Sequence, residues 1–222
     1  MADPAPIRIG VLISGSGSNL QTLIDNCEVG FIPGQIAMVI SNNPDAYGIT
    51  RAQEKGIAVK TINHRDHPDR DSFDLEVGNA LEEAKVDLVC LAGFMRILTS
   101  SFVKRFQGRL INIHPSLLPA FPGLHVQQQA IDAGVRFSGA TVHFVDEEVD
   151  TGPIIVQAVV PILPDDTAKQ LAARILVQEH RIYPLSVRLF ARGQLKLKNS
   201  HVQIVDGGAD PDAALINPPF PH

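Results

Sequence analysis

Short apolar runs alternate with helix-patterned segments along the first half of the chain. The runs are too continuously apolar for strands with one wet face, which is typical of strands buried on both faces of a parallel sheet. In 72–85, apolar residues recur at Phe73, Val77 and Leu81, the spacing of a helix buried on one side. The predicted strands are 7–13, 36–41, 57–62, 87–92 and 110–114, and the predicted helices include 19–27, one ending near 56, and 72–85.

This alternation predicts right-handed crossovers and therefore an α/β, Rossmann-like fold with a mainly parallel open sheet flanked by helices. Further along, apolar runs at 139–144 and 154–160 enclose an acidic loop and predict an antiparallel hairpin in the C-terminal part of the same sheet. A long helix is expected to begin at the Asp165-Asp166-Thr167 cap and to reach about Arg192. Pro184 is expected to kink or divide it.

No repeat or long linker interrupts the pattern, so a single domain over 1–222 is expected, with a disordered leader at 1–6 and a loosely ordered tail at 207–222. Apolar residues make up 45% of the chain and charged residues 19%, which is ordinary for a globular protein. The net charge of -5 argues against a nucleic-acid partner. No apolar run is long enough to span a membrane, and the first residues do not resemble a signal peptide. The two cysteines lack CxxC spacing, so a cytoplasmic protein with reduced thiols is expected.

The stretch 110–123 holds the strongest candidate chemistry. Asn112 and His114 are two residues apart at the end of a predicted strand, so their side chains share one face, about 7 Å apart. Pro115 should end the strand pairing. An amide can donate to a developing oxyanion, and an imidazole can exchange a proton near neutral pH. Spacing alone leaves open the alternative of a structural asparagine and a capping histidine.

A glycine-rich loop, residues 15–19, joins the first predicted strand to the first helix. Leu20 occupies the place of the third glycine of the dinucleotide fingerprint, and the lysine of a P-loop is missing. The loop therefore favours a small phosphate or phosphoribosyl group at the helix N-terminus over NAD or a nucleoside triphosphate. A plain turn is the alternative.

Two other polar clusters are less specific. Asp146, Glu147, Glu148 and Asp150 form an acidic loop of the kind that is usually a solvated turn, although a carboxylate beside an imidazole would stabilise the imidazolium. His64 and His67 are spaced like metal ligands but stand in a charged loop without cysteine. Because metal sites need three or four ligands, no metal is expected.

The segment Asn-Ile-His-Pro-Ser-Leu-Leu-Pro at 112–119, followed by Pro-Gly at 122–123, resembles the signature of folate-dependent formyltransferases. Residues 14–21, Ser-Gly-Ser-Gly-Ser-Asn-Leu-Gln, narrow the resemblance to members that act on glycinamide ribonucleotide in purine biosynthesis. The resemblance extends from about residue 7 to about residue 197. It implies 10-formyltetrahydrofolate as the formyl donor, and small molecules as the partners of a monomer or homodimer.

The resemblance also implies roles for particular residues. Asp-x-Gly-Pro at 150–153 makes Asp150 the catalytic aspartate beside Asn112 and His114. The ribonucleotide would contact Gly17, Ser18, Asn19 and Glu179, and the folate would contact Arg70, Met95, Arg96, Ile97, Leu98 and Asn112. One departure is Leu176, three residues before Glu179, where a polar or basic residue is expected in some relatives.

These residues predict direct transfer, in which the substrate amine attacks the formyl carbon. Asn112 and protonated His114 would donate to the oxyanion, and Asp150 would hold His114 protonated. A formyltetrahydrofolate hydrolase is the main rival, but as a family it carries an N-terminal regulatory domain and needs no phosphate loop. A transfer-RNA formyltransferase would need a C-terminal domain and a basic surface. An inactive folate- or phosphate-binding module is hard to reconcile with all three catalytic candidates.

Overall fold

The computed structural model describes residues 5–205, so most of the predicted leader and the whole predicted tail at 207–222 lie outside the described residues. The elements follow in this order: β1 (Ile7–Ile13), α1 (Ser18–Glu28), β2 (Gly34–Ser41), α2 (Tyr47–Glu54), β3 (Val59–Thr61), a 3-10 turn (His64–Asp66), α3 (Arg70–Glu83), β4 (Leu88–Leu91), α4 (Ser100–Arg105), β5 (Leu110–His114), α5 (Val126–Asp132), β6 (Phe137–Phe144), β7 (Ile154–Pro161), α6 (Ala168–Ala191), β8 (Leu195–Lys198) and β9 (His201–Ile204).

One seven-stranded sheet organises these elements, with strand order β3-β2-β1-β4-β5-β6-β7. The first five strands of the chain pair in parallel, and β6 and β7 add antiparallel pairs after β5. This arrangement confirms the predicted fold class, including the hairpin in the C-terminal part of the sheet. A separate two-stranded sheet, β8-β9, was not predicted, because its mostly exposed, polar residues give no core pattern.

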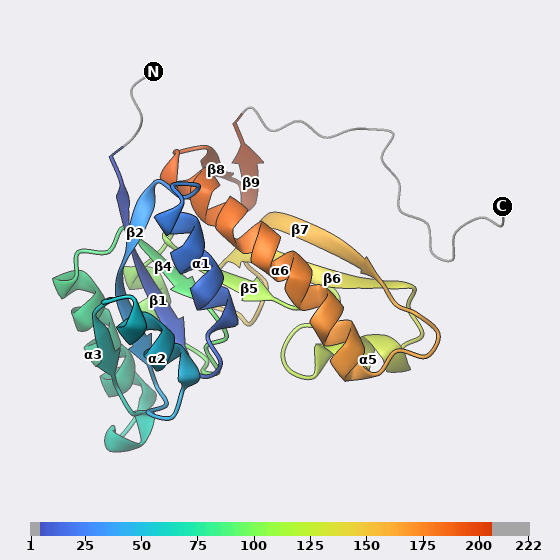
Figure 1. The fold of residues 1–222 in the computed structure, drawn as a ribbon, viewed down its shortest axis with the longest axis horizontal. Coiled ribbons are helices and arrows are strands. Elements are labelled where there is room, and N and C mark those ends of the chain that lie inside the picture. Colours follow the sequence, from blue (N-terminus) through green and yellow to red (C-terminus); the bar gives the residue numbers. More distant parts are fainter. Residues whose placement is uncertain (1–4, 206–222) are drawn as a thin grey trace.

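Helices cover both faces of the sheet. Figure 1 shows α1 and α6 side by side over one face, and their apolar residues join those of α2 and α5 in one core with alternate residues of β1. On the other face, Phe73 and Leu81 of α3 and Phe102 of α4 pack with Leu12 of β1 in a second core. The sheet is thus buried from both sides, as its continuously apolar strands require.

Several predicted boundaries differ from the structure. The predicted loop at 63–71 contains the 3-10 turn and the start of α3, where the Asp69 side chain accepts a hydrogen bond from the backbone of Ser72. Helices α4 and α5, of six and seven residues, were missed because they are too short to show a helical period. The alternative that Pro184 divides the last helix is wrong, since α6 continues through it. Buried residues on both sides of the proline, Tyr183 and Val187, hold α6 against the sheet.

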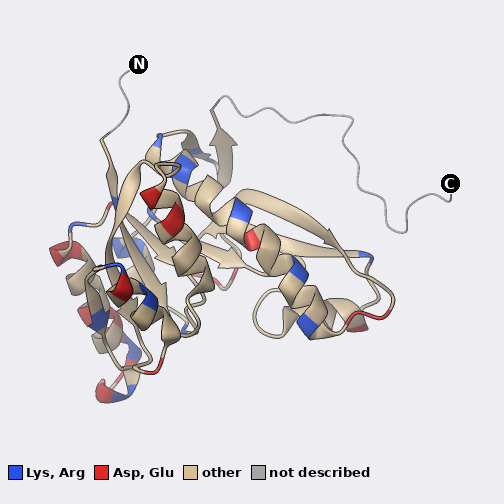
Figure 2. Cartoon of the chain, in the orientation of Figure 1, with Lys and Arg blue, Asp and Glu red and all other residues tan. Residues whose placement is uncertain are grey.

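The signs of the charged residues are distributed differently along the helices. Figure 2 shows basic residues recurring along α6, whereas acidic and basic residues are interspersed over α2 and α3. Among the described helices, none is both long and apolar enough to cross a membrane. The parallel strands end in polar residues at one edge of the sheet, and ligands of open α/β sheets bind at this edge.

Candidate active site

The end of β5 presents Asn112 and His114 on the same face, opposite the core residues Ile111 and Ile113, as predicted. His114 is buried, its Nε2 lies 3.0 Å from the carbonyl oxygen of Phe121, and its Nδ1 lies 3.4 Å from Oδ2 of Asp150. A carbonyl can only accept, so Nε2 must carry a proton. The other nitrogen faces a carboxylate oxygen, so the ring lies between two hydrogen-bond acceptors.

Asp150 is brought to this position by the loop between β6 and β7. Its backbone is in the left-handed region, with φ of 57°, a conformation that aspartate tolerates better than most residues. Its Oδ2 accepts a hydrogen bond of 2.9 Å from the backbone N–H of Gly123. The same carboxylate oxygen therefore joins the β6–β7 loop both to His114 and to the proline-rich loop after β5, while Oδ1 has no hydrogen bond among the described residues.

His143 on β6 is a further member of this cluster that the sequence reasoning missed. It pairs directly with Asn112 across the antiparallel β5–β6 ladder, and its Nε2 lies 3.3 Å from Nδ2 of Asn112. Burial lowers the pKa of His143, and its Nδ1 donates to the Phe144 carbonyl at 2.9 Å. The neutral ring thus offers Nε2 as an acceptor, which fixes the orientation of the Asn112 amide. No local pattern in the sequence indicates this pair, because it depends on the register between β5 and β6.

The loop after β5 is held rigidly by Thr141. This side chain donates to the Ser116 carbonyl at 2.7 Å and accepts from the Leu118 backbone at 3.1 Å. Ser116 closes the turn by donating to the Ala120 carbonyl at 2.6 Å. These contacts place the Phe121 carbonyl against His114, so the imidazole is oriented by a preformed loop.

The glycine loop begins α1 at the carboxyl end of β1. Gly17 is the N-cap with φ of 70°, and no side chain caps the first N–H groups of the helix. A Cβ on Gly17 would lie 2.6 Å from Cα of Gly48, whereas a Cβ on Gly15 would meet nothing within 4 Å. Gly17 is therefore required for packing against α2, and Gly15 borders open space. The loop lines a cavity of about 200 Å³ together with Ala92, Gly93 and Met95.

Asn19 and Glu179, which are 160 residues apart in the chain, meet below this loop. Nδ2 of Asn19 donates to Oε2 of Glu179 at 2.7 Å, and both side chains are buried. Burial raises the pKa of Glu179, and the hydrogen bond from Asn19 opposes that shift. Oδ1 of Asn19 has no partner in the described part of the chain. Two residues predicted to contact the ribonucleotide are thus in direct contact, while Leu176 is partly buried one turn earlier on α6.

The segment predicted to contact folate borders a second cavity, of about 100 Å³. Arg96, Ile97 and Leu98 line it on one side, with His143 and Asp150 on the other. Met95 instead lines the cavity of the glycine loop. Arg70 is exposed at the start of α3 and lines neither cavity, so the structure does not bring it to the other predicted folate residues.

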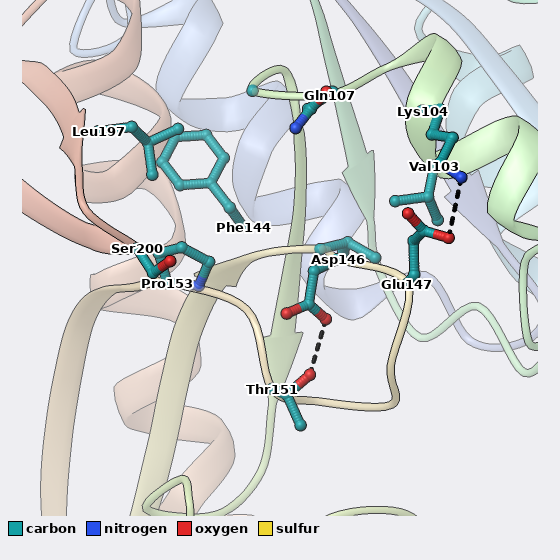
Figure 3. Close-up of a pocket in the computed structure, with 12 residues that line it drawn as sticks. Val103, Lys104, Gln107, Phe144, Asp146, Glu147, Thr151, Pro153, Leu197 and Ser200 are labelled. Atoms are coloured by element: carbon teal, nitrogen blue, oxygen red, sulfur yellow. Dashed lines mark hydrogen bonds and ion pairs between the residues drawn. The ribbon is translucent and has the colours of Figure 1, made fainter.

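A larger cavity, of about 420 Å³, lies behind the β6–β7 loop but contains none of the predicted catalytic residues. In Figure 3 its walls are formed by Phe144, Leu197 and the loop that carries Asp146 and Thr151. Thr151 donates to Asp146 at 2.7 Å, and Lys104 of α4 lies 3.2 Å from Glu147. These contacts fasten the loop on both sides of Asp150.

The histidines considered as metal ligands lie elsewhere. His64 is in the 3-10 turn, and its Nδ1 lies 3.4 Å from the carbonyl oxygen of Asn42. Nε2 of His67 lies 3.3 Å from Oε2 of Glu76. Within residues 5–205, no three His, Cys, Asp or Glu side chains are grouped so that they could hold a metal ion.

The site is thus an acid–base cluster at the carboxyl edge of a Rossmann-like sheet, flanked by a glycine loop. A family model described as formyl transferase matches residues 7–187. The chain belongs to the formyl transferase family, a family of enzymes, which confirms the family predicted from the sequence.

Three relatives illustrate the similarity. The phosphoribosylglycinamide formyltransferase of Haemophilus influenzae is 47% identical over 210 residues, which cover 95% of this chain and 99% of that protein. The trifunctional purine biosynthetic protein adenosine-3 of Drosophila melanogaster is 53% identical over 188 residues, so 84% of this chain matches only 14% of that protein. The crystal structure of glycinamide ribonucleotide transformylase 1 from Symbiobacterium toebii has a TM-score of 0.90 and 51% identity, covering 91% of this chain and 95% of that one.

The buried Glu179 makes stability depend on pH. Because its pKa is raised in the folded protein, the unfolded chain loses this proton first as pH rises above about 4.3. Stability is therefore lost between that pH and the higher pKa of the folded state. Glu179→Gln keeps an acceptor for Asn19 and adds a donor for its unpaired oxygen. Urea unfolding should show the variant gaining stability relative to the unsubstituted protein between pH 4 and pH 8.

Glu83→Gln, at an exposed position on α3, is the matched control and should show no such gain. If the difference in free energy of unfolding between Glu179→Gln and the unsubstituted protein stayed constant between pH 4 and pH 8, burial would not destabilise the charged form of this carboxyl.

Proposed function

We propose that the chain transfers the formyl group of 10-formyltetrahydrofolate to the amine of glycinamide ribonucleotide, forming formylglycinamide ribonucleotide and tetrahydrofolate in purine biosynthesis. The observation that carries the proposal is the contact of Asp150 with His114, in a cluster that also holds Asn112 and His143. Asp150 and His143 line one cavity with residues 96–98, and the glycine loop lines a second cavity. The relatives named above support this proposal, because the match to the Haemophilus influenzae enzyme extends over nearly the whole of both chains.

In this proposal the ribonucleotide lies along the glycine loop. Its phosphate would meet the uncapped N–H groups of residues 17–19, which a helix dipole makes attractive to an anion. The ribose hydroxyls would meet Glu179, and Asn19 would keep that carboxylate in place. Binding there directs the substrate amine toward the end of β5.

The folate would occupy the other cavity. Its flat pterin would contact the backbone of residues 95–98 and the apolar side chains of Ile97 and Leu98, with Arg96 at the same edge. Asn112 would meet the formyl oxygen. Arg70 is proposed to contact the glutamate of the folate at the periphery, where its exposed position leaves it available.

The chemistry follows from the charges of the cluster. The amine attacks the formyl carbon, and the carbonyl electrons move to oxygen. One N–H of Asn112 is engaged by His143, which leaves the other to donate to this oxyanion. Protonated His114 would donate as well once its Nδ1–H turns from the Asp150 carboxylate to the oxyanion. The intermediate collapses by breaking the bond from carbon to the folate nitrogen. Asp150 receives the amine proton through water and returns it to that leaving nitrogen.

The proposed setting is the cytoplasm, with 1–222 acting as one domain in a monomer or homodimer and without a resident metal. Support for the location comes from the free cysteines, since reduced thiols are usual there. Burial raises the pKa of Cys27 to about 11, which keeps this thiol unreactive.

An absorbance assay separates the proposed transferase from the rival hydrolase. The purified protein should convert 10-formyltetrahydrofolate to tetrahydrofolate only when glycinamide ribonucleotide is present. Conversion without the ribonucleotide at the same rate would favour formyltetrahydrofolate hydrolase. Binding of both molecules without any conversion would favour an inactive binding module.

The two glycines of the loop give a test of the phosphate position. Gly15→Val places a side chain into open space next to the proposed phosphate, so the Kd for glycinamide ribonucleotide should rise about tenfold or more while stability changes little. Gly17→Ala should instead destabilise the fold by about 1–3 kcal/mol, because of its positive φ and the contact with Gly48. Calorimetric titration and thermal unfolding measure the two effects. Unchanged ribonucleotide affinity in folded Gly15→Val would show that the phosphate lies elsewhere.

The His114–Asp150 pair is tested by a double-mutant cycle. Asp150→Asn keeps the size of the side chain and removes its charge, so kcat should fall by about 10² or more. His114→Ala should cost a similar factor. Because the two groups act as a unit, the double variant should be little slower than either single variant. Fully multiplicative losses of kcat would contradict the coupled mechanism without contradicting the family.

A further inference from the structure

One short segment borders both proposed substrate cavities. Ala92, Gly93 and Met95 line the cavity of the glycine loop, and Arg96, Ile97 and Leu98 line the cavity next to Asp150. The segment runs from the end of β4 to the start of α4. Its middle, between Met95 and Arg96, is therefore the boundary between the two cavities.

Few hydrogen bonds hold this segment in place. At its ends, the backbone of Ala92 donates to Leu12 at 2.9 Å, and that of Thr99 donates to the buried Asp74 carboxylate at 2.6 Å. Within the described part of the chain, residues 93–98 form a single hydrogen bond, from the Met95 backbone N–H to Oγ of Ser14 at 2.8 Å. The Arg96 guanidinium adds a contact over the Phe73 ring, 4.9 Å from its centre.

Ser14 belongs to the opposite wall, immediately before the glycine loop. Its hydroxyl accepts from Met95 and donates to Oδ1 of Asn42 at 2.6 Å, and Asn42 is buried at the end of β2. Hydrogen bonds in such a chain polarise and strengthen one another. One hydroxyl thus connects the wall of the first cavity to the midpoint of the segment that borders the second.

We infer that Ser14 is a positioning residue that couples the two substrate sites. Glycinamide ribonucleotide bound to the glycine loop fixes the position of Ser14. Ser14 in turn fixes the backbone of Met95, which keeps residues 96–98 in the conformation that binds the folate. Since coupling between sites is reciprocal, the folate must improve ribonucleotide binding by the same factor. This inference rests on the proposed function, because it assumes that both substrates bind at these cavities.

The test is a thermodynamic cycle with tetrahydrofolate, which occupies the folate site without reacting. Calorimetric titration gives its Kd for the full chain alone and with saturating glycinamide ribonucleotide. The unsubstituted protein should bind tetrahydrofolate about fivefold or more tightly when the ribonucleotide is present, the lower end of usual coupling. Ser14→Ala should bring this factor close to one, and Ser14→Thr, which retains a hydroxyl, should restore it.

Ser101→Ala is the matched control, because it removes an exposed hydroxyl from α4, outside both proposed substrate cavities, and should leave the coupling factor as it was. Circular dichroism verifies that each variant is folded. A factor of one in the unsubstituted protein, or an undiminished factor in folded Ser14→Ala, overturns the inference while both substrates still bind. If the unsubstituted protein binds neither molecule, the proposed function itself is wrong.

Discussion

The candidate site depends on the burial of His114 between two hydrogen-bond acceptors. The Phe121 carbonyl faces Nε2 and the Asp150 carboxylate faces Nδ1, so the orientation of the ring is set from both sides. Each acceptor lies on a different loop, and Gly123 links the two loops through the same carboxylate. The loop after β5 and the β6–β7 loop therefore have to adopt one mutual arrangement, and the β6–β7 loop in turn lines the cavity next to residues 96–98.

His143 lies on the neighbouring strand, paired with Asn112 across the β5–β6 ladder. Its Nδ1 is engaged by a backbone carbonyl, and its Nε2 lies 3.3 Å from the amide nitrogen of Asn112 and 3.8 Å from Oδ1 of Asp150. Burial lowers the pKa of His143 even though the Asp150 carboxylate opposes that shift. Two histidines on neighbouring strands thus have different surroundings: His114 lies between a carbonyl and a carboxylate, and His143 lies between a carbonyl and the Asn112 amide. This difference arises from the partners of each nitrogen rather than from the residue type.

The glycine loop and the segment after β4 show how a parallel sheet brings distant residues together. Strands β1 and β4 are neighbours in the sheet although β2, β3, three α-helices and the 3-10 turn separate them in the chain. Their carboxyl ends meet at one edge, where Ser14 contacts Met95. Tyr183 of α6 supports the same edge from below by donating to the Leu91 carbonyl at the end of β4.

The local residue pattern was enough to predict the fold class, the strand that carries Asn112 and His114, and the loop that opens α1, because continuous apolar runs, proline and glycine act locally. Family resemblance was needed to single out Asp150 and Glu179. Four features became visible only in the folded chain: His143 contacts Asn112, Gly17 packs on Gly48, Arg70 lies away from the other predicted folate residues, and α6 continues through Pro184. These features depend on strand register and on packing between elements far apart in the chain, which no local pattern of residues encodes.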